Sequence, residues 1–376
     1  MIQIHASYLE LDGSNYEIGR RLGQAAAKLA QEMPGGAPAL PVLEAGDAKR
    51  AKEMFDLWCP GLTGEIEGYA DALGIEPAKA PFYAMTYLRP NCSQLAALPQ
   101  KTKSGHVLQA RSYEMSYQLE DFVLARTSIP GRHTHLGTTV MGLGREEGLN
   151  DKGLGVTMSS CGFPVGAAPG MRQPALRGLQ FWAVLRSLLE NCASVGEALD
   201  YLTDMPIAYN LNLIIADKSG RAALFETLGG RKAVRRIGPD GGAQFIHAAN
   251  HPHIGELAAA EPRGMANSVY RYGYIGRYIG SIGEVTAQDL RELLLGTYPE
   301  GLACHYHDEY FGTTKSVVMD LNDGTLDICW GGLAQNGWRS FNVARRLDNS
   351  TQQVLIQNEK SPEGFFEMTD CGPAVT

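Results

Sequence analysis

The order of apolar patterns along the chain is the feature that most restricts its fold. From residue 92 onward, short β-like runs with glycine-containing turns alternate with pairs of segments whose apolar residues have helical spacing. The sequence therefore predicts strands, two helices, strands, two helices and strands, in that order. This order is typical of an α+β protein in which helices cover stacked sheets.

The individual elements of this region follow from the same patterns. Strands are predicted at 106–114, 135–143, 150–160, 209–228 (with a turn at 217–220), 243–251 and 315–332 (with a hairpin turn at 322–324). Helices are predicted at 175–192, 194–205, 266–280 and 286–297.

The first 91 residues have a different pattern. A weak strand is predicted at 4–11, and helices are predicted at 13–33, 46–58, 63–74 and 80–88. Gly19 and Gly23 lower the helix propensity of the first helix, which indicates a close packing partner there. We therefore divide the chain into a helix-rich N-terminal segment, 1–91, which is a pro-segment or small subunit, and a catalytic body, 92–376.

Composition excludes several classes of function. Hydrophobic residues make up 44% of the 376 residues and charged residues 20%, which is ordinary for a globular protein with a core. The net charge of −8, without a basic run, argues against nucleic-acid binding. No stretch approaches the ~18 apolar residues of a membrane span, and the N-terminus lacks a signal-peptide pattern. The seven cysteines are odd in number and form no CxxC pair, so we expect reduced thiols and a cytoplasmic protein.

Cys92 lies where the helical pattern changes to the β pattern, within the polar stretch "RPNCSQLAA". Taken alone, a free cysteine is more often a small buried hydrophobic residue than a nucleophile. Arg111 and Glu114 stand three apart on the next predicted strand, so they face opposite sides unless a turn or bulge intervenes. Asn250, in "HAANHP", ends a strand, where asparagine is usually a turn residue.

The order of these features carries more information than any one of them. The series "NCSQ", "QARSYEMS", "GLNDKGLGVT", "NLIIADKSGRAALFE" and "ANHP" resembles the cysteine-type N-terminal-nucleophile hydrolases. The nearest branch is the isopenicillin N acyltransferase-like (acyl-CoA:6-aminopenicillanic acid acyltransferase) family, with acid ceramidase and the choloylglycine hydrolases more distant. "GSNYEIGRRLGQ" is similar to the N-terminal segment of that branch, and the resemblance runs from about residue 13 to residue 332.

The resemblance implies a four-layer αββα sandwich and a precursor that cuts itself before the cysteine. It implies that Cys92 is the nucleophile, Arg111 the arginine beside it, and Asn250 a donor to the oxyanion. Glu114 stands where the family usually has Asp. The resemblance further implies that Arg263, or alternatively Arg271, binds substrate, and that Ser160 is a second oxyanion contact.

An N-terminal cysteine has its own base in its α-amine, whose pKa of about 7.7–8.0 suits a thiol of pKa ~8.5. Arg111 would lower the thiol pKa, Glu114 would orient the amine or the arginine, and the thiolate would attack an amide or ester carbonyl. The acyl group then passes to water or to another amine. We predict a self-processing amidohydrolase or acyltransferase for a small acyl amide or thioester, without a cofactor. The protein partners we consider are the N-terminal fragment and a second copy of the chain.

Two other functions remain open at this point. A metal-dependent hydrolase could use His251 and His253, or the cluster Cys304, His305, His307, Asp308 and Glu309, although polar loops at strand ends are the commoner explanation. An inactive binding descendant of the fold is suggested by Asn91, where the family commonly has Gly, and by Glu114 in place of Asp.

Overall fold

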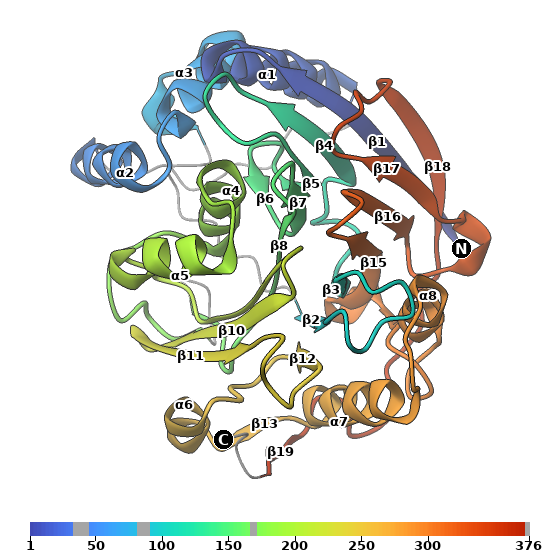
Figure 1. Cartoon of the computed structure of the whole chain (residues 1–376). Helices are drawn as coiled ribbons and strands as arrows, with labels where there is room; N and C mark the ends of the chain where they lie inside the picture. The colour runs from blue at the N-terminus through green and yellow to red at the C-terminus, as the bar shows by residue number, and fades with distance from the viewer. Residues whose placement is uncertain (33–44, 81–90, 166–170, 373–376) are drawn as a thin grey trace.

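Two β-sheets form the centre of the protein (Figure 1). The computed structural model describes residues 1–32, 45–80, 91–165 and 171–372. The helix expected at 80–88 falls on 81–90, outside the described residues.

The larger sheet contains β1 and most strands of the chain's middle third. Its strands are β1 (Ile2–Asp12), β4 (Val123–Ser128), β5 (His135–Val140), β6 (Gly144–Arg145), β7 (Gly148–Asn150), β8 (Leu154–Ser160), β9 (Leu211–Asp217), β10 (Arg221–Leu228), β11 (Arg231–Ile237) and β18 (Ser350–Ile356). Their order is β11-β10-β9-β8-β7-β5-β4-β1-β18, with β6 paired to β5. The β1–β4 pair is parallel, and the other pairs are antiparallel.

The smaller sheet contains the strand that begins beside Cys92. Its strands are β2 (Asn91–Ala97), β3 (Leu108–Met115), β12 (Phe245–Ala248), β14 (His305–Tyr306), β15 (Phe311–Asp320), β16 (Thr325–Trp330) and β17 (Arg339–Asn342). The order is β12-β2-β3-β15-β16-β17, with β14 paired to β15. A separate short pair joins β13 (Arg263–Met265) to β19 (Met368–Asp370).

Helices cover the outer face of each sheet. The helices are α1 (Asn15–Glu32), α2 (Ala45–Trp58), α3 (Leu62–Leu73), α4 (Phe181–Asn191), α5 (Val195–Asp204), α6 (Gly255–Ala260), α7 (Ala266–Ser281) and α8 (Ala287–Leu295), with short 3₁₀ turns at Pro77–Lys79, His307–Glu309 and Ala334–Asn336. In Figure 1, α4 and α5 lie against the larger sheet, whereas α7 and α8 lie against the smaller one. The predicted four-layer αββα sandwich is therefore confirmed.

The strand sequences match these layers. In β9, Leu213 and Ile215 pack toward the helices, and Ile214 and Ala216 pack between the sheets. Because both faces of this strand are buried, it forms the continuous apolar run that the sequence shows.

The N-terminal segment contributes a strand to the larger sheet and a pair of closely packed helices. Its strand β1 pairs with β4 on one side and with β18 on the other. Helix α1 packs tightly on α3 because Gly19 lies against the backbone of Glu65: a Cβ added at Gly19 would lie 1.8 Å from the Glu65 carbonyl oxygen. The close partner expected for Gly19 and Gly23 is therefore α3.

Several elements differ from the sequence predictions. Residues 175–180, expected to begin a helix, precede α4, which starts at Phe181. The helix α6 and the strands β4, β6, β11, β13, β14, β17, β18 and β19 were not predicted. No helix in the described parts of the chain is long and apolar enough to cross a membrane.

Candidate active site

Cys92 is the second residue of β2, and its side chain is completely buried. It is paired in register with Tyr113 of β3. Burial raises the pKa of the Cys92 thiol to about 12, and the positive charge of Arg111 opposes this increase. In the uncut chain the thiol is therefore protonated at neutral pH.

Arg111 of β3 lies beside the sulfur of Cys92. Its Nη2 donates to Cys92 Sγ at 3.0 Å, and its Nη1 donates to the Glu146 carbonyl at 2.8 Å. Nη1 also forms an ion pair with Glu147, and the guanidinium lies 4.4 Å from the centre of the Tyr113 ring. The sequence analysis missed Glu147, because acidic residues such as those of "GREEG" are usually exposed and nothing in the sequence marks this one as buried.

Asn250 follows β12, the strand that pairs with β2, and contacts the backbone of Cys92. Its Oδ1 accepts from the Cys92 backbone N–H at 3.1 Å and from Arg271 at 2.8 Å. Because two donors face Oδ1, the Nδ2 group points to Ser160, where it lies 2.9 Å from Oγ and 3.4 Å from the carbonyl oxygen. The structure thus brings Cys92, Arg111, Asn250 and Ser160 together.

Arg271 of α7, the alternative to Arg263 in the sequence analysis, also lies at this cluster. It is completely buried, and its Nη1 donates to the Cys92 carbonyl at 2.9 Å and to Ser93 Oγ at 2.6 Å. Arg263 lies elsewhere, on β13, where its exposed side chain donates to the Met368 carbonyl. No hydrogen bond among the described residues joins Arg263 to Cys92.

Glu114 lies on the other face of β3 from Arg111. β3 pairs with β2 in continuous register, whereas its pairing with β15 shifts register opposite Glu114, between Thr313 and Lys315, where the extra residue belongs to β15. Glu114 Oε1 accepts from the Ser112 hydroxyl and, at 3.3 Å, from the Thr313 hydroxyl, whereas the buried Glu114 Oε2 has no partner among the described residues. Burial raises the pKa of Glu114 to about 7, and the charge of Arg271 opposes this increase. Glu114 is also the cross-strand neighbour of Asn91.

A second buried charge cluster adjoins Arg111. Lys315 of β15 forms ion pairs with Glu120 at 2.5 Å and with Glu146, and its Nζ lies 4.0 Å from the centre of the Tyr113 ring. The sequence analysis did not identify these residues, because they come from separate strands and turns.

A family-model comparison of the sequence covers more than half of the chain. Residues 102–335 match the acyl-coenzyme A:6-aminopenicillanic acid acyl-transferase family. The chain belongs to this family. The matched range contains Arg111, Glu114, Asn250 and Arg271 but begins after Cys92. Membership of the acyl-transferase family confirms the predicted resemblance and the prediction of an enzyme of the hydrolase or acyltransferase class.

Solved structures similar to this acyl-transferase family member include a hydrolase, an acylase and an amidase. A mutant of conjugated bile acid hydrolase from Clostridium perfringens has 12% identity and a TM-score of 0.45, covering 72% of this chain and 99% of its own. Penicillin V acylase from Agrobacterium tumefaciens has 14% sequence identity and a TM-score of 0.40, and the match covers 64% of this chain and 83% of the acylase chain. The N-acylethanolamine-hydrolyzing acid amidase ortholog of Caenorhabditis elegans has 14% sequence identity and a TM-score of 0.42, and the match covers 61% of this chain and 93% of the amidase chain. No curated protein matches the sequence.

The histidines considered as metal ligands have other contacts in this acyl-transferase family member. His251 Nδ1 lies 2.8 Å from Ser268 Oγ, and His253 Nε2 accepts from the Ala249 backbone at 3.2 Å. His307 Nδ1 accepts from the Tyr117 backbone at 3.2 Å. Within the described ranges, the group of three ligand-type side chains that converge is a different one, consisting of His106, Asp320 and Asp323.

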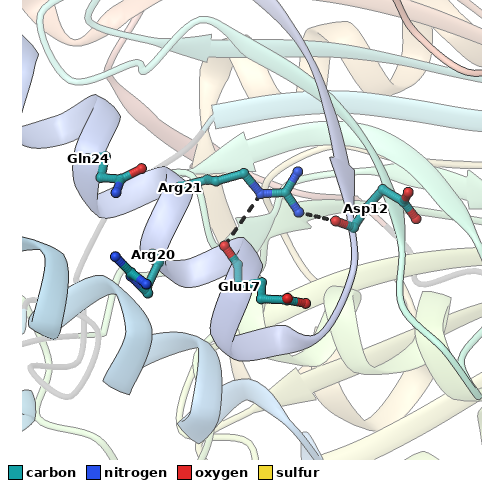
Figure 2. A pocket seen from close by; sticks show the side chains of 5 residues that line it. All are labelled: Asp12, Glu17, Arg20, Arg21 and Gln24. Carbon is teal, nitrogen blue, oxygen red and sulfur yellow. Dashed lines mark hydrogen bonds between the residues drawn. The ribbon is translucent and has the colours of Figure 1, made fainter.

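The described part of the protein has two surface hollows whose lining residues do not include Cys92. Figure 2 shows the first, at the junction of β1 and α1, where Asp12, Glu17, Arg20, Arg21 and Gln24 line a polar hollow. Arg21 crosses it and donates to the carbonyls of Glu17 and Asp12. The second lies between α5 and the edge formed by β10 and β11. Cys92 lines neither hollow.

Proposed function

We propose that this protein is a self-processing amidohydrolase or acyltransferase that cleaves or exchanges an acyl amide bond through a thioester on Cys92. The observation that carries the proposal is the set of contacts around this one residue. Arg111 contacts its sulfur, Asn250 its backbone nitrogen and Arg271 its carbonyl oxygen. The backbone N–H and carbonyl of any buried residue need partners, but a cysteine buried only for packing does not need an arginine beside its sulfur. Here, in addition, side chains rather than a neighbouring strand contact both backbone groups.

The first reaction is cleavage between Asn91 and Cys92. The thiol gives up its proton, and the sulfur bonds to the carbonyl carbon of Asn91. The bond from that carbon to the Cys92 nitrogen breaks, and the nitrogen takes up the proton as an amine. Water then hydrolyses the thioester, which releases the Asn91 carboxylate and restores the thiol.

The freed amine supplies the base for turnover. It accepts the thiol proton, and the thiolate bonds to the carbonyl carbon of the substrate amide. The C–N bond breaks, and the departing amine receives the proton. Water or a second amine then attacks the thioester, so one mechanism covers hydrolysis and acyl transfer.

The surrounding side chains have separate roles in this mechanism. Asn250 Oδ1 holds the Cys92 nitrogen before and after cleavage, and Nδ2 and Ser160 supply hydrogen-bond donors toward the oxyanion. Arg111 stabilises the thiolate. Glu114 is the cross-strand neighbour of Asn91, so its unpartnered Oε2 becomes a partner for the new α-amine once the peptide bond is cut.

Competitive alkylation of the processed protein tests the nucleophile. Cys371 is the most exposed of the seven cysteines, and the other six are buried. Exposure alone therefore predicts that limiting iodoacetamide modifies Cys371 first. An activated nucleophile predicts that Cys92 is modified first, as read by peptide mass spectrometry, and that Arg111→Gln slows it. Modification of Cys371 with Cys92 left unmodified would contradict the proposal.

A further inference from the structure

Three polar side chains lie side by side across the larger sheet. Ser159 of β8 pairs in register with Asn212 of β9, and Asn212 pairs with Glu226 of β10. All three side chains are completely buried. Because buried polar groups are costly unless they are hydrogen-bonded, this row requires partners of its own.

The first two members of the row bind the backbone on both sides of Asn250. Ser159 Oγ donates to the Ala249 carbonyl at 2.5 Å. Asn212 Nδ2 donates to the same carbonyl at 2.9 Å and to the His251 carbonyl at 3.1 Å. One amide group therefore fixes the carbonyls immediately before and after Asn250.

The third member binds the next part of the same loop. The two carboxylate oxygens of Glu226 accept from the backbone N–H groups of His253 at 2.8 Å and Ile254 at 2.9 Å. From the opposite side, Ser268 of α7 accepts from the Asn250 backbone N–H at 2.8 Å. The loop at 249–254 is thus held by side chains of the larger sheet, although it continues a strand of the smaller sheet.

The orientation of the Asn212 amide is decided by this loop. Its Nδ2 faces two carbonyl oxygens, while its buried Oδ1 has no partner among the described residues. The side chain thus leaves one acceptor unpaired while both loop carbonyls keep their donor. An apolar residue of similar size would avoid the unpaired oxygen but would release the loop.

We infer that Asn212 is a positioning residue, which sets the place of the Asn250 side chain through the two carbonyls that flank it, with Ser159 and Glu226 as supports. This inference rests on the proposed role of Asn250. An oxyanion donor stabilises the transition state only if it is held in place before the reaction, so a loosened loop lowers the rate of the chemical step.

Self-cleavage at Asn91–Cys92 provides a substrate built into the chain. The full chain is made by pulse-labelled cell-free translation, and the first-order rate of cleavage is followed for the wild type, Asn212→Leu, Ser159→Ala, Asn250→Ala and the double variant Asn212→Leu/Asn250→Ala. We expect Asn212→Leu to slow cleavage about 10- to 100-fold and Ser159→Ala about 3- to 10-fold. Ser159→Ala removes one hydroxyl, so it keeps the test valid if Asn212→Leu does not fold.

The matched control is Gln109→Leu. Gln109 is also completely buried in the layer between the sheets, and its Nε2 donates to Thr157 and to the Ile214 carbonyl, not to the loop. It should lower the melting temperature about as much as Asn212→Leu while changing the cleavage rate less than about threefold.

The double variant separates positioning from general destabilisation. If Asn212 acts through Asn250, the double variant cleaves within about threefold of Asn250→Ala alone, because the group being positioned is already gone. The inference is overturned if the two effects multiply, or if Asn212→Leu and Ser159→Ala both cleave like the control. Wild-type cleavage in Asn250→Ala would instead overturn the proposed role of Asn250.

Discussion

At the scale of single residues, the site depends on which atoms of Asn250 face which partners. Its Oδ1 accepts from the Cys92 nitrogen and from Arg271, so Nδ2 points to Ser160. In the proposed mechanism Nδ2 also donates to the oxyanion. The side chain is nearly completely buried, so its effect on charge is not weakened by solvent. Asn250 should therefore matter mainly in the transition state.

Replacing Asn250 by Ala tests this role. We expect kcat to fall by roughly 10²–10³, with little change in KM, because a lost oxyanion donor affects the transition state more than the bound substrate. Steady-state kinetics and melting temperature are measured on the same preparation of processed enzyme. A variant that melts earlier but keeps its kcat would show that Asn250 only shapes the turn.

Glu114 links the site to stability through pH. Its pKa is raised from 4.5 to about 7 in the folded protein, so the folded state holds this proton more tightly than the unfolded state. Stability from this group is complete below about pH 4.5 and is lost as the pH rises through about 7. The loss corresponds to about 3 kcal/mol.

Glu114→Gln, in a Cys92→Ala chain that stays uncut, should therefore be more stable than its parent at pH 8 and nearly equal to it at pH 4.5. Urea unfolding at both pH values measures this difference. If the variant and its parent were equally stable at pH 8, the ionised Glu114 carboxylate would not destabilise the folded protein.

In the processed enzyme, Glu114→Gln should lower kcat strongly, whereas Glu114→Asp should keep more activity because it retains the carboxylate.

The sequence predicts an arginine at the site, but it does not decide which of two arginines lies there. Arg271 lies one helical turn after Asn267, to which it donates at 2.8 Å, and this face of α7 meets Cys92. Arg263 precedes α7 on β13, where its own side chain is exposed. Because both arginines lie within a few residues of the helix start, the sequence could name both but could not choose between them.

At the scale of elements, the contact between α1 and α3 depends on glycines at the helix crossing. A Cβ at Gly19 would lie 1.8 Å from the Glu65 carbonyl oxygen, and one at Gly68 would lie 2.1 Å from the Tyr16 carbonyl oxygen. These backbones therefore approach more closely than a side chain permits. The contact also holds Glu65, which forms a buried ion pair with Arg186 of α4.

Gly19→Ala should destabilise the protein by about 1–3 kcal/mol, because the methyl group forces the two helices apart. Gly64→Ala is the matched control, since Gly64 also lies in a helix but nothing lies within 4 Å of the added Cβ. The control should be stabilised by about 0.5–1 kcal/mol through helix propensity. Urea unfolding of both variants would contradict the close contact if Gly19→Ala were as stable as Gly64→Ala.

Elements with strong apolar patterns could be predicted, whereas the polar edge strand β11 and the short central strand β4, which lies between β1 and β5, could not. Residues 213–216 of β9, "LIIA", are apolar on both faces of the strand, and both faces are buried. By contrast, β11 has the sequence "RKAVRRI", whose charged residues are typical of an exposed strand at a sheet edge. The row of Ser159, Asn212 and Glu226 depends on cross-strand register, which a single sequence does not specify.

At the scale of the whole molecule, the N-terminal segment is part of the sandwich. Strand β1 lies between β4 and β18, and β18 pairs with no other described strand. The buried pair of Glu65 and Arg186 adds two hydrogen bonds, at 2.7 and 2.6 Å, between this segment and the body. A cut at residue 91 breaks one peptide bond and leaves these contacts in place.

The two fragments should therefore remain associated after cleavage. Size-exclusion chromatography of the processed protein should give one peak that contains both fragments, and they should separate only in denaturant. Recovery of the 92–376 fragment alone, still folded, would contradict this role of β1.

The mass of the purified protein under denaturing conditions tests the central claim most directly. The proposed mechanism requires two polypeptides, one ending at Asn91 and the other beginning with Cys92, and a single uncut chain from the Cys92→Ala variant. An active enzyme that consists only of the full-length chain, with the peptide bond before Cys92 intact, would contradict the account, because Cys92 would then have no α-amine to act as its base.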